Sequence, residues 1–271
     1  MEYDRDYFKG KTAVVTGAAS GIGLALIEEL LESGADKTVL SDINEENLTK
    51  NVARLEGLYP GRVKGIVCDV TNEEAINALI SGSAEFFDGK IDLLFNNAGA
   101  TFEGWFEDTS NERWKAAFDL NFYGALFGMR AVIPVMKSQG GGQIINIISG
   151  TAFMPMAKWS TYVSTKAALN ALSLALRTEY WDDNIKIVSA TPGTTATAIF
   201  GDSSPREDQM QSPHQSASRI LNGVVNNDRI IFGDDGDVSG GSFCFHPEAA
   251  KGNDEYLLRV ARERRQGITA I

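Results

Sequence analysis

Three side chains between Gln143 and Lys166 are suited to proton transfer. Ser149 follows the β-branched run Gln143–Ile148, which predicts a buried parallel strand, and open α/β sheets carry their sites at such carboxyl ends. Tyr162 and Lys166 stand four residues apart in an Ala/Leu-rich stretch, so a helix would place both on one face. A neighbouring cation stabilises a phenolate, so we expect Lys166 to lower the pKa of Tyr162 from about 10. The alternative is an exposed Tyr/Lys pair on an amphipathic helix.

A glycine-rich turn near the amino terminus could bind a diphosphate. Lys11–Thr16 predicts a strand, and it is followed by Gly17-Ala-Ala-Ser-Gly-Ile-Gly23 and a predicted helix through Leu31. At such a turn, backbone N–H groups and the helix dipole face an anion, while glycine allows close approach. A tight strand-to-helix turn without a ligand would show the same glycines.

An acidic residue stands where a dinucleotide's ribose would lie. Asp42 ends a second predicted strand, Thr38–Ser41, nineteen residues after Gly23. A carboxylate there accepts hydrogen bonds from both ribose hydroxyls and repels a 2′-phosphate. The turn contains no Lys or Arg, and Ile43 follows Asp42, so the sequence favours NAD over NADP. The other explanation for Asp42 is a helix cap or a solvated loop acid.

Strands and helices alternate along the chain, which predicts a doubly wound parallel α/β sheet with helices on both faces. Further strands are expected at Arg62–Cys68, Ile91–Phe95 and Ile185–Ala190. Thr109-Ser-Asn-Glu112 matches a capping box that would open one long helix. The expected apolar stripe of this helix is Trp114, Phe118, Phe122, Ala125, Met129 and Val132. Asn121 interrupts this stripe, as a satisfied polar group at a bend would.

Length and charge set limits on the class of protein. The chain has 271 residues, 43% of them hydrophobic, which suits one domain spanning 1–271. A net charge of −11 argues against nucleic acid or an anionic membrane as partner. Met1–Lys9 is polar and no apolar run reaches the ~18 residues of a membrane span, so we expect a cytoplasmic protein. With two Cys and two His residues, no metal site is predicted.

The motifs together resemble the short-chain dehydrogenase/reductase family over about residues 8–200. The matching residues are Thr16-Gly17-xxx-Gly21-x-Gly23, Asp69-Val70, Asn97-Ala98-Gly99, Asn121, Ser149, Tyr162-xxx-Lys166 and Pro192-Gly193. The resemblance implies a Rossmann-like fold, a bound NAD or NADP, and an oxidoreductase acting on an alcohol or ketone. Proteins of this fold that lack chemistry should lose the Ser, Tyr, Lys or Asn, and all four are present.

The resemblance also implies a role for each motif residue. Tyr162 would be the general acid/base, and Lys166 would tune it and hold the nicotinamide ribose. Ser149 would stabilise the reacting oxygen, and Asn121 would hold a water for proton relay. The cofactor-binding residues would be Gly17, Ser20, Gly21, Ile22, Gly23, Asp42, Ile43, Asp69, Val70, Asn97, Gly99, Tyr162, Lys166, Pro192, Gly193, Thr195 and Thr197.

The resemblance fails beyond about residue 200. We expect 200–218 to form a substrate-side loop and Arg229–Phe232 a last strand. Residues 233–271 would be a divergent extension, with a helix at about Pro247–Gln266 whose arginines form a solvated basic face. Small residues on the Tyr162 helix, such as Ala167, and the family's helix pairing predict a homodimer at least, with the family's homotetramer as the alternative.

Apolar residues near the expected reaction centre predict the substrate class. They are Phe102, Trp105, Phe153, Met154, Met156, Trp159, Ile199, Phe200 and Met210. Lys158 is the lone cation among these segments, whereas a phosphorylated or CoA-linked substrate would call for paired basic groups. We therefore expect a secondary alcohol, or the matching ketone, of largely apolar character. An NADP-linked carbonyl or 3-oxoacyl reductase is the alternative, and a non-catalytic dinucleotide-binding protein is a more remote one.

Overall fold

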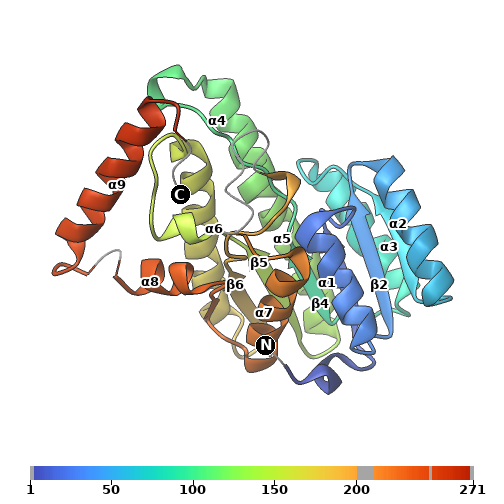
Figure 1. Cartoon of the computed structure of the whole chain (residues 1–271). Helices are drawn as coiled ribbons and strands as arrows, with labels where there is room; N and C mark the ends of the chain where they lie inside the picture. The colour runs from blue at the N-terminus through green and yellow to red at the C-terminus, as the bar shows by residue number, and fades with distance from the viewer. Residues whose placement is uncertain (1–2, 200–209, 244–245, 269–271) are drawn as a thin grey trace.

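A seven-stranded parallel sheet forms the centre of the protein (Figure 1). The computed structural model describes residues 3–199, 210–243 and 246–268. The strands are β1 (Thr12–Thr16), β2 (Lys37–Asp42), β3 (Val63–Val67), β4 (Leu93–Asn96), β5 (Gly142–Ile147), β6 (Ile185–Ala190) and β7 (Ile230–Ile231). Their order, β3-β2-β1-β4-β5-β6-β7, reverses direction between β1 and β4, where open α/β sheets bind ligands. The predicted Rossmann-like fold is confirmed.

Helices cover both faces of the sheet because strand side chains alternate between them. The main helices are α1 (Gly21–Glu32), α2 (Glu45–Leu58), α3 (Glu73–Phe86), α4 (Asn111–Phe118), α5 (Gly124–Ser138), α6 (Ser160–Glu179) and α7 (Pro213–Asn226). Residues of α1, α2 and α7 share one core cluster with alternate strand residues, and those of α3, α5 and α6 share the other. Within the described ranges, no helix is long and apolar enough to cross a membrane.

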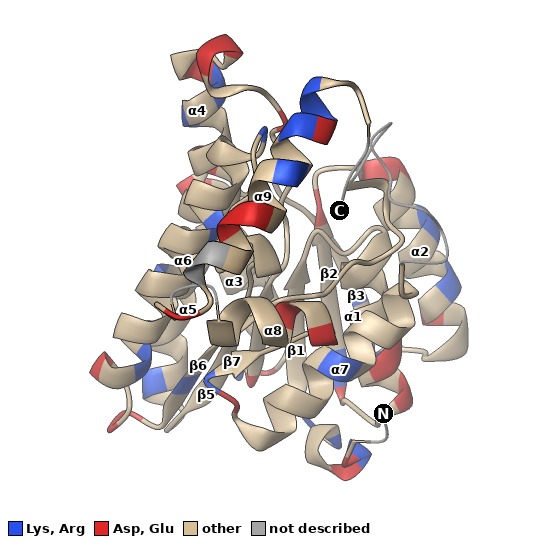
Figure 2. Ribbon diagram, turned by 60° about the vertical axis from the view of Figure 1, so that its left-hand side comes forward, with Lys and Arg blue, Asp and Glu red and all other residues tan. Residues whose placement is uncertain are grey.

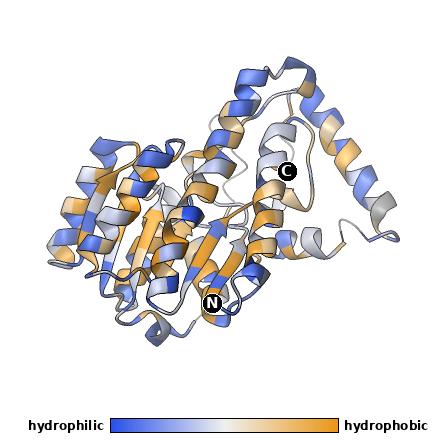
Figure 3. Cartoon of the chain, turned by 180° about the vertical axis from the view of Figure 1, so that it is seen from behind, coloured by the Kyte–Doolittle hydropathy of each residue, from blue (hydrophilic) through white to orange (hydrophobic). Residues whose placement is uncertain are grey.

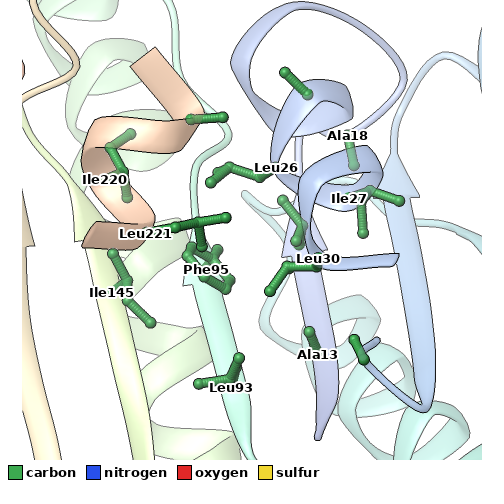
Figure 4. Close-up of a cluster of buried hydrophobic side chains, with 14 of the residues drawn as sticks. Ala13, Ala18, Leu26, Ile27, Leu30, Leu93, Phe95, Ile145, Ile220 and Leu221 are labelled. Carbon is green, nitrogen blue, oxygen red and sulfur yellow. The ribbon is translucent and has the colours of Figure 1, made fainter. Parts of the chain in front are cut away.

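The packing of α1 and α7 illustrates how the sheet is sealed. Leu26 and Leu30 of α1, together with Ile220 of α7, lie over Phe95 of β4 and Ile145 of β5 (Figure 4). All five side chains are fully buried, and burying each contributes roughly 1.5–3 kcal/mol. The strands are correspondingly apolar along much of their length (Figure 3). This rigid layer fixes the ends of β1, β4 and β5.

The helix predicted to open with a capping box at Thr109 differs in two respects. Ser110, not Thr109, is the cap, since its Oγ accepts from Arg113 N at 3.3 Å. The Thr109 hydroxyl instead donates to Trp105 O at 2.7 Å, which commits it to the preceding turn. The helix is also interrupted by a wide π-helical turn, η3 (Asp119–Tyr123), between α4 and α5. Such turns often occur at functional sites, and this one contains Asn121.

Helices occupy much of the described C-terminal part. Of the predicted loop 200–218, residues 200–209, with Phe200, lie outside the described residues, and α7 begins at Pro213 with a Ser212 cap. The acidic, glycine-rich stretch after 233 forms α8 (Asp235–Phe243). The predicted terminal helix is present as α9 (Ala250–Arg265). In Figure 1, α8 and α9 extend beyond the sheet layers on the side of α6.

Candidate active site

The turn between β1 and α1 has a shape that only glycine permits. Gly17 has φ +64°, and a Cβ on it would lie 2.8 Å from Ala98 Cα at the end of β4. A Cβ on Gly23 would collide with Gly17 O. Ser20 is the N-cap of α1 and makes no side-chain capping bond among the described residues, so its side chain leaves the N–H groups of the first turn available to an anion. The turn therefore fits a diphosphate, as predicted.

Two cavities lie along the carboxyl edge of the sheet, one on each side of this turn. The glycine-turn cavity, of about 510 Å³, is lined by the predicted residues Gly17, Ser20, Asp42, Ile43, Asp69, Val70, Asn97 and Gly99. The tyrosine cavity, of about 320 Å³, is lined by the predicted residues Ile22, Ser149, Tyr162, Pro192, Gly193, Thr195 and Thr197. Between them, a Cβ on Gly21 would lie 3.2 Å from Thr197 Cγ2. Among described residues, neither cavity is lined by Lys or Arg.

Asp42 stands at the rim of the glycine-turn cavity. Its Oδ2 accepts from Ala19 N at 3.0 Å and its Oδ1 from Asn44 N at 2.9 Å. These bonds fix the carboxylate at the end of β2 while each oxygen keeps room for a further donor. The neighbouring residue, Ile43, is apolar and its side chain is 66% exposed. It therefore brings no positive charge to this rim of the cavity.

Two predicted cofactor residues are engaged within the protein itself. Asn97 Nδ2 donates to Thr16 O at 2.9 Å and to Gly17 O at 3.0 Å, which braces the glycine turn. Asp69 Oδ1 accepts from both the backbone N and the hydroxyl of Thr71. The structure thus gives Asn97 and Asp69 shaping roles at the cavity wall.

Ser149 and Tyr162 meet in the tyrosine cavity, but the electrostatics differ from the prediction. Tyr162 is 6% exposed, and burial raises the pKa of its phenol to about 12. The nearby Ser149 hydroxyl lowers this pKa, and the negative charge of Asp237 raises it. Lys166 does not counteract the shift, because its ammonium donates to Ile147 O at 2.8 Å and lies 5.8 Å from the Tyr162 ring centroid. The prediction of a lowered tyrosine pKa is therefore wrong.

Lys166 and Asn121 converge on Gly99. A Cβ on Gly99 would lie 2.7 Å from Asn121 Oδ1 and 3.3 Å from Lys166 Nζ. Asn121 is 1% exposed and exchanges two hydrogen bonds with the backbone of Ala100, at 3.0 and 2.9 Å. Burial lowers the pKa of Lys166 to about 8. The wide turn η3 thus positions Asn121 as a support for the Gly99–Ala100 backbone beneath both cavities.

The loop after β6 is held from the C-terminal side. Gly193 has φ +71°, and its N–H donates to Asp237 Oδ2 at 3.2 Å. Thr194 N donates to Asp234 Oδ2 at 2.9 Å. Thr195 Oγ1 donates back to Pro192 O at 3.1 Å, so it closes the loop on itself. Two acids that precede or begin α8 therefore fix the wall of the tyrosine cavity.

The predicted apolar residues divide between the two cavities and the core. Met154, Met156, Trp159 and Ile199 line the tyrosine cavity. Phe102 lines the glycine-turn cavity instead. Phe153 packs on Phe232 at 5.8 Å between ring centroids, and Met210 does not line either cavity.

The arginines of α9 form the predicted solvated face only in part: Arg259, Arg262 and Arg265 are exposed, but Arg264 is partly buried and Arg264 and Arg265 both contact tryptophan rings. The Arg264 guanidinium lies 4.5 Å from the Trp159 ring centroid and donates to Ala157 O at 2.7 Å. Arg265 lies 3.6 Å from the Trp105 centroid. Lys158, predicted to be the lone cation here, pairs with Glu103. The end of α9 is thus docked by cation–π contacts onto segments that enclose the tyrosine cavity.

Sequence reasoning missed Asp234, Asp237 and Tyr256, which also line this cavity. One signal was available in the sequence: an aspartate that precedes a helix commonly caps it, and Asp234 stands three residues before Asp237. In the structure Asp237 N donates to Asp234 Oδ1 at 2.7 Å. Gly236, Gly240 and Gly241 obscured this signal because glycine disfavours helix. In Figure 2 acidic residues stand at the beginning of α8.

Comparison with known sequences gives a consistent set of matches. The family model described as short chain dehydrogenase matches residues 11–208. The chain is 36% identical over 211 residues to an uncharacterized oxidoreductase of Staphylococcus aureus strain MW2, covering 78% of this chain and 89% of that protein. It is 35% identical over 192 residues to an uncharacterized oxidoreductase of Staphylococcus saprophyticus, covering 71% and 81%.

Solved structures show the same likeness. A short-chain dehydrogenase/reductase from Burkholderia phymatum in complex with NAD has a TM-score of 0.77 at 25% identity, covering 91% of this chain and 92% of that chain. A 7α-hydroxysteroid dehydrogenase complexed with NADH and 7-oxo glycochenodeoxycholic acid has a TM-score of 0.78 at 26% identity, covering 86% and 96%.

Proposed function

This chain belongs to the short-chain dehydrogenase/reductase family of NAD(P)-dependent oxidoreductases, and we propose that it transfers a hydride between NAD and a secondary alcohol or its ketone. The observation that carries the proposal is the meeting of Ser149 and Tyr162 in one cavity, next to a glycine turn whose shape would suit a diphosphate. NAD(H) would supply the hydride acceptor or donor.

Tyr162 is proposed to exchange a proton with the substrate oxygen. Because its pKa is raised, the neutral phenol is the stable form, and it is ready to protonate a carbonyl oxygen during reduction. Ser149, already within hydrogen-bonding reach of the phenol, would donate to the same oxygen and stabilise its developing charge. Alcohol oxidation requires the phenolate, so oxidation should accelerate as pH rises.

Lys166 and Asn121 are proposed to support the cofactor side of the site. Lys166 is buried at the base of the Gly99 backbone, where an ammonium can hold ribose hydroxyls, and the position of Asn121 keeps Gly99 open. The backbone contacts of Asn121 argue for a structural role in addition to any bound water. Pro192, Gly193, Thr195 and Thr197 would enclose the nicotinamide end.

The proposed preference is for NAD. Asp42 places a carboxylate at the rim of the glycine-turn cavity, and no Lys or Arg among the described lining residues would neutralise a 2′-phosphate. The Burkholderia phymatum neighbour was solved with NAD. The alternative is an NADP-linked carbonyl or 3-oxoacyl reductase of the same fold, and higher kcat/KM with NADPH than with NADH would favour it.

The proposed substrate is a neutral, largely apolar secondary alcohol or ketone. Met154, Met156, Trp159 and Ile199 supply apolar walls, while the only charged side chains among the described lining residues are acidic. These acids would repel phosphorylated, CoA-linked or dicarboxylate substrates. Steady-state kinetics on aliphatic, cyclic and aryl alcohols, sugars and acyl thioesters, followed by NADH absorbance, tests this. Best turnover on a sugar or thioester would contradict the substrate class.

We also propose a homodimer built through η3, α5 and α6. Tyr123 is 42% exposed and stacks on Phe127, with ring centroids 6.0 Å apart, on a surface that one copy does not cover. The small residues Ala167 and Ala171 of α6 would allow close helix approach. Light scattering at micromolar concentration tests the assembly, and a monomer there would contradict it.

A further inference from the structure

Asp237 of α8 joins the C-terminal extension to the site. Its Oδ2 accepts from Gly193 N at 3.2 Å, and the nearby Thr191 hydroxyl lowers the pKa of this carboxyl group. A Cβ on Gly150, the residue after Ser149, would collide with the Asp237 carboxyl group. One carboxylate therefore touches the ends of both β5 and β6, beside Tyr162 in the same cavity. Asp237 lies beyond the matched residues 11–208, so the family match does not account for it.

We propose that Asp237 is a positioning residue of the acid/base site, which holds the Pro192–Thr194 loop and supplies a negative charge that keeps the Tyr162 phenol protonated. The proposal rests on the proposed acid/base role of Tyr162. It gives the C-terminal extension a defined effect on the reaction: carbonyl reduction is sustained to higher pH, and the rise in alcohol oxidation is delayed to higher pH.

The charge balance around Tyr162 supports this effect. The groups that face Tyr162 and Asp237 are Ser149 and Thr191 from strand ends, Lys166 on α6, Asp234 before α8, and Tyr256 on α9. The only cation among them, Lys166, is turned toward Ile147 O. Burial and the Asp234 charge raise the pKa of Asp237 to about 6. Asp237 is thus mostly ionised at neutral pH, and its charge destabilises a nearby phenolate.

Asp237→Asn tests the charge while keeping an acceptor for Gly193 N–H. The midpoint of the rise in kcat/KM for alcohol oxidation should fall by about one pH unit relative to the unaltered enzyme. KM for NAD should stay close to normal in Asp237→Asn. In Asp237→Ala, which loses the acceptor as well, KM for NAD should rise several-fold. Asp235→Asn is the matched control, since it makes the same charge change two residues away on an exposed side chain.

The protonation of Tyr162 can be measured by NMR, independently of turnover. With ¹³Cζ-labelled tyrosine, the Tyr162 resonance is assigned by its absence from Tyr162→Phe, and it should titrate at lower pH in Asp237→Asn than in Asp235→Asn. If Asp237→Asn does not fold, Asp237→Ser removes the same charge and is read in the same way. An unshifted midpoint, with Tyr162→Phe inactive, would overturn the role of Asp237 and leave the proposed function standing. Turnover retained in Tyr162→Phe would overturn the proposed function itself.

Discussion

The two cavities at the sheet edge are built from different parts of the chain. The glycine-turn cavity uses residues 17–120, most of them in turns at the ends of consecutive strands. The tyrosine cavity also draws on three later segments: the loop after β6, residues 234–240 around the start of α8, and Tyr256 of α9. The glycine-turn cavity is formed by the backbone of turns within the β/α units. The tyrosine cavity is complete only when the C-terminal extension packs against the sheet. Substitutions in the glycine-turn cavity should therefore affect the diphosphate and adenosine end of the cofactor, whereas substitutions in the tyrosine cavity should affect the substrate and the nicotinamide end.

The largest effect is expected from Tyr162→Phe, which should abolish turnover without abolishing cofactor binding. Tyr162→Phe removes the proton donor but no residue of the glycine-turn cavity, so turnover should fall by about a thousand-fold or more. NADH binding, followed by cofactor fluorescence, should persist. Loss of both together would mean that the two cavities are not separable.

A second effect concerns stability and pH in the tyrosine cavity alone. The folded-state pKa of Asp237, about 6, lies above its unfolded value, so its protonated form favours folding at low pH, and this contribution is lost as pH rises through about 6. Asp237→Asn should therefore become more stable relative to the unaltered protein between about pH 4 and pH 7, by at most about 3 kcal/mol. Urea unfolding at the two pH values measures this. A pH-independent difference would indicate that Asp237 is ionised without cost.

Asp42→Ala tests the glycine-turn cavity. Removing the carboxylate should narrow the ratio of kcat/KM for NAD to that for NADP by about ten-fold, because roughly 1.4 kcal/mol of repulsion and ribose binding is lost. The pH profile set at Tyr162 should not move. If the unaltered enzyme prefers NADP, the role assigned to Asp42 is wrong.

The smallest expected effect comes from the docking of α9. Arg264→Ala removes the contact over Trp159 and the bond to Ala157 O, so substrate KM should rise about three-fold, within the ~1 kcal/mol of an exposed cation–π pair. Arg259→Ala is a matched control on the same helix, because Arg259 contacts Tyr256 and Glu263 of α9 itself. An equal rise in substrate KM in the two variants would argue against a specific role for the contacts of Arg264 with Trp159 and Ala157.

The same division explains what the sequence could predict. Strand and turn positions follow from local periodicity, so β6 (Ile185–Ala190) and the glycine turn were predicted with little error. Asp237 could not be found in this way, because its partners Gly150 and Gly193 are distant in sequence. The pKa of Tyr162 was predicted in the wrong direction because helical spacing places Lys166 on the right face but does not say that Ile147 O holds its ammonium.

The contacts between the α9 arginines and two tryptophans should also make tryptophan fluorescence sensitive to the position of α9. Of the four tryptophans, Trp159 and Trp105 lie under guanidinium groups of α9, whereas Trp181 is already 57% exposed. Undocking of α9 would hydrate the first two indoles and shift their emission to longer wavelength, while the sheet remains folded. In a urea titration, a fluorescence change that precedes the loss of circular dichroism would register the opening of the extension as a separate event.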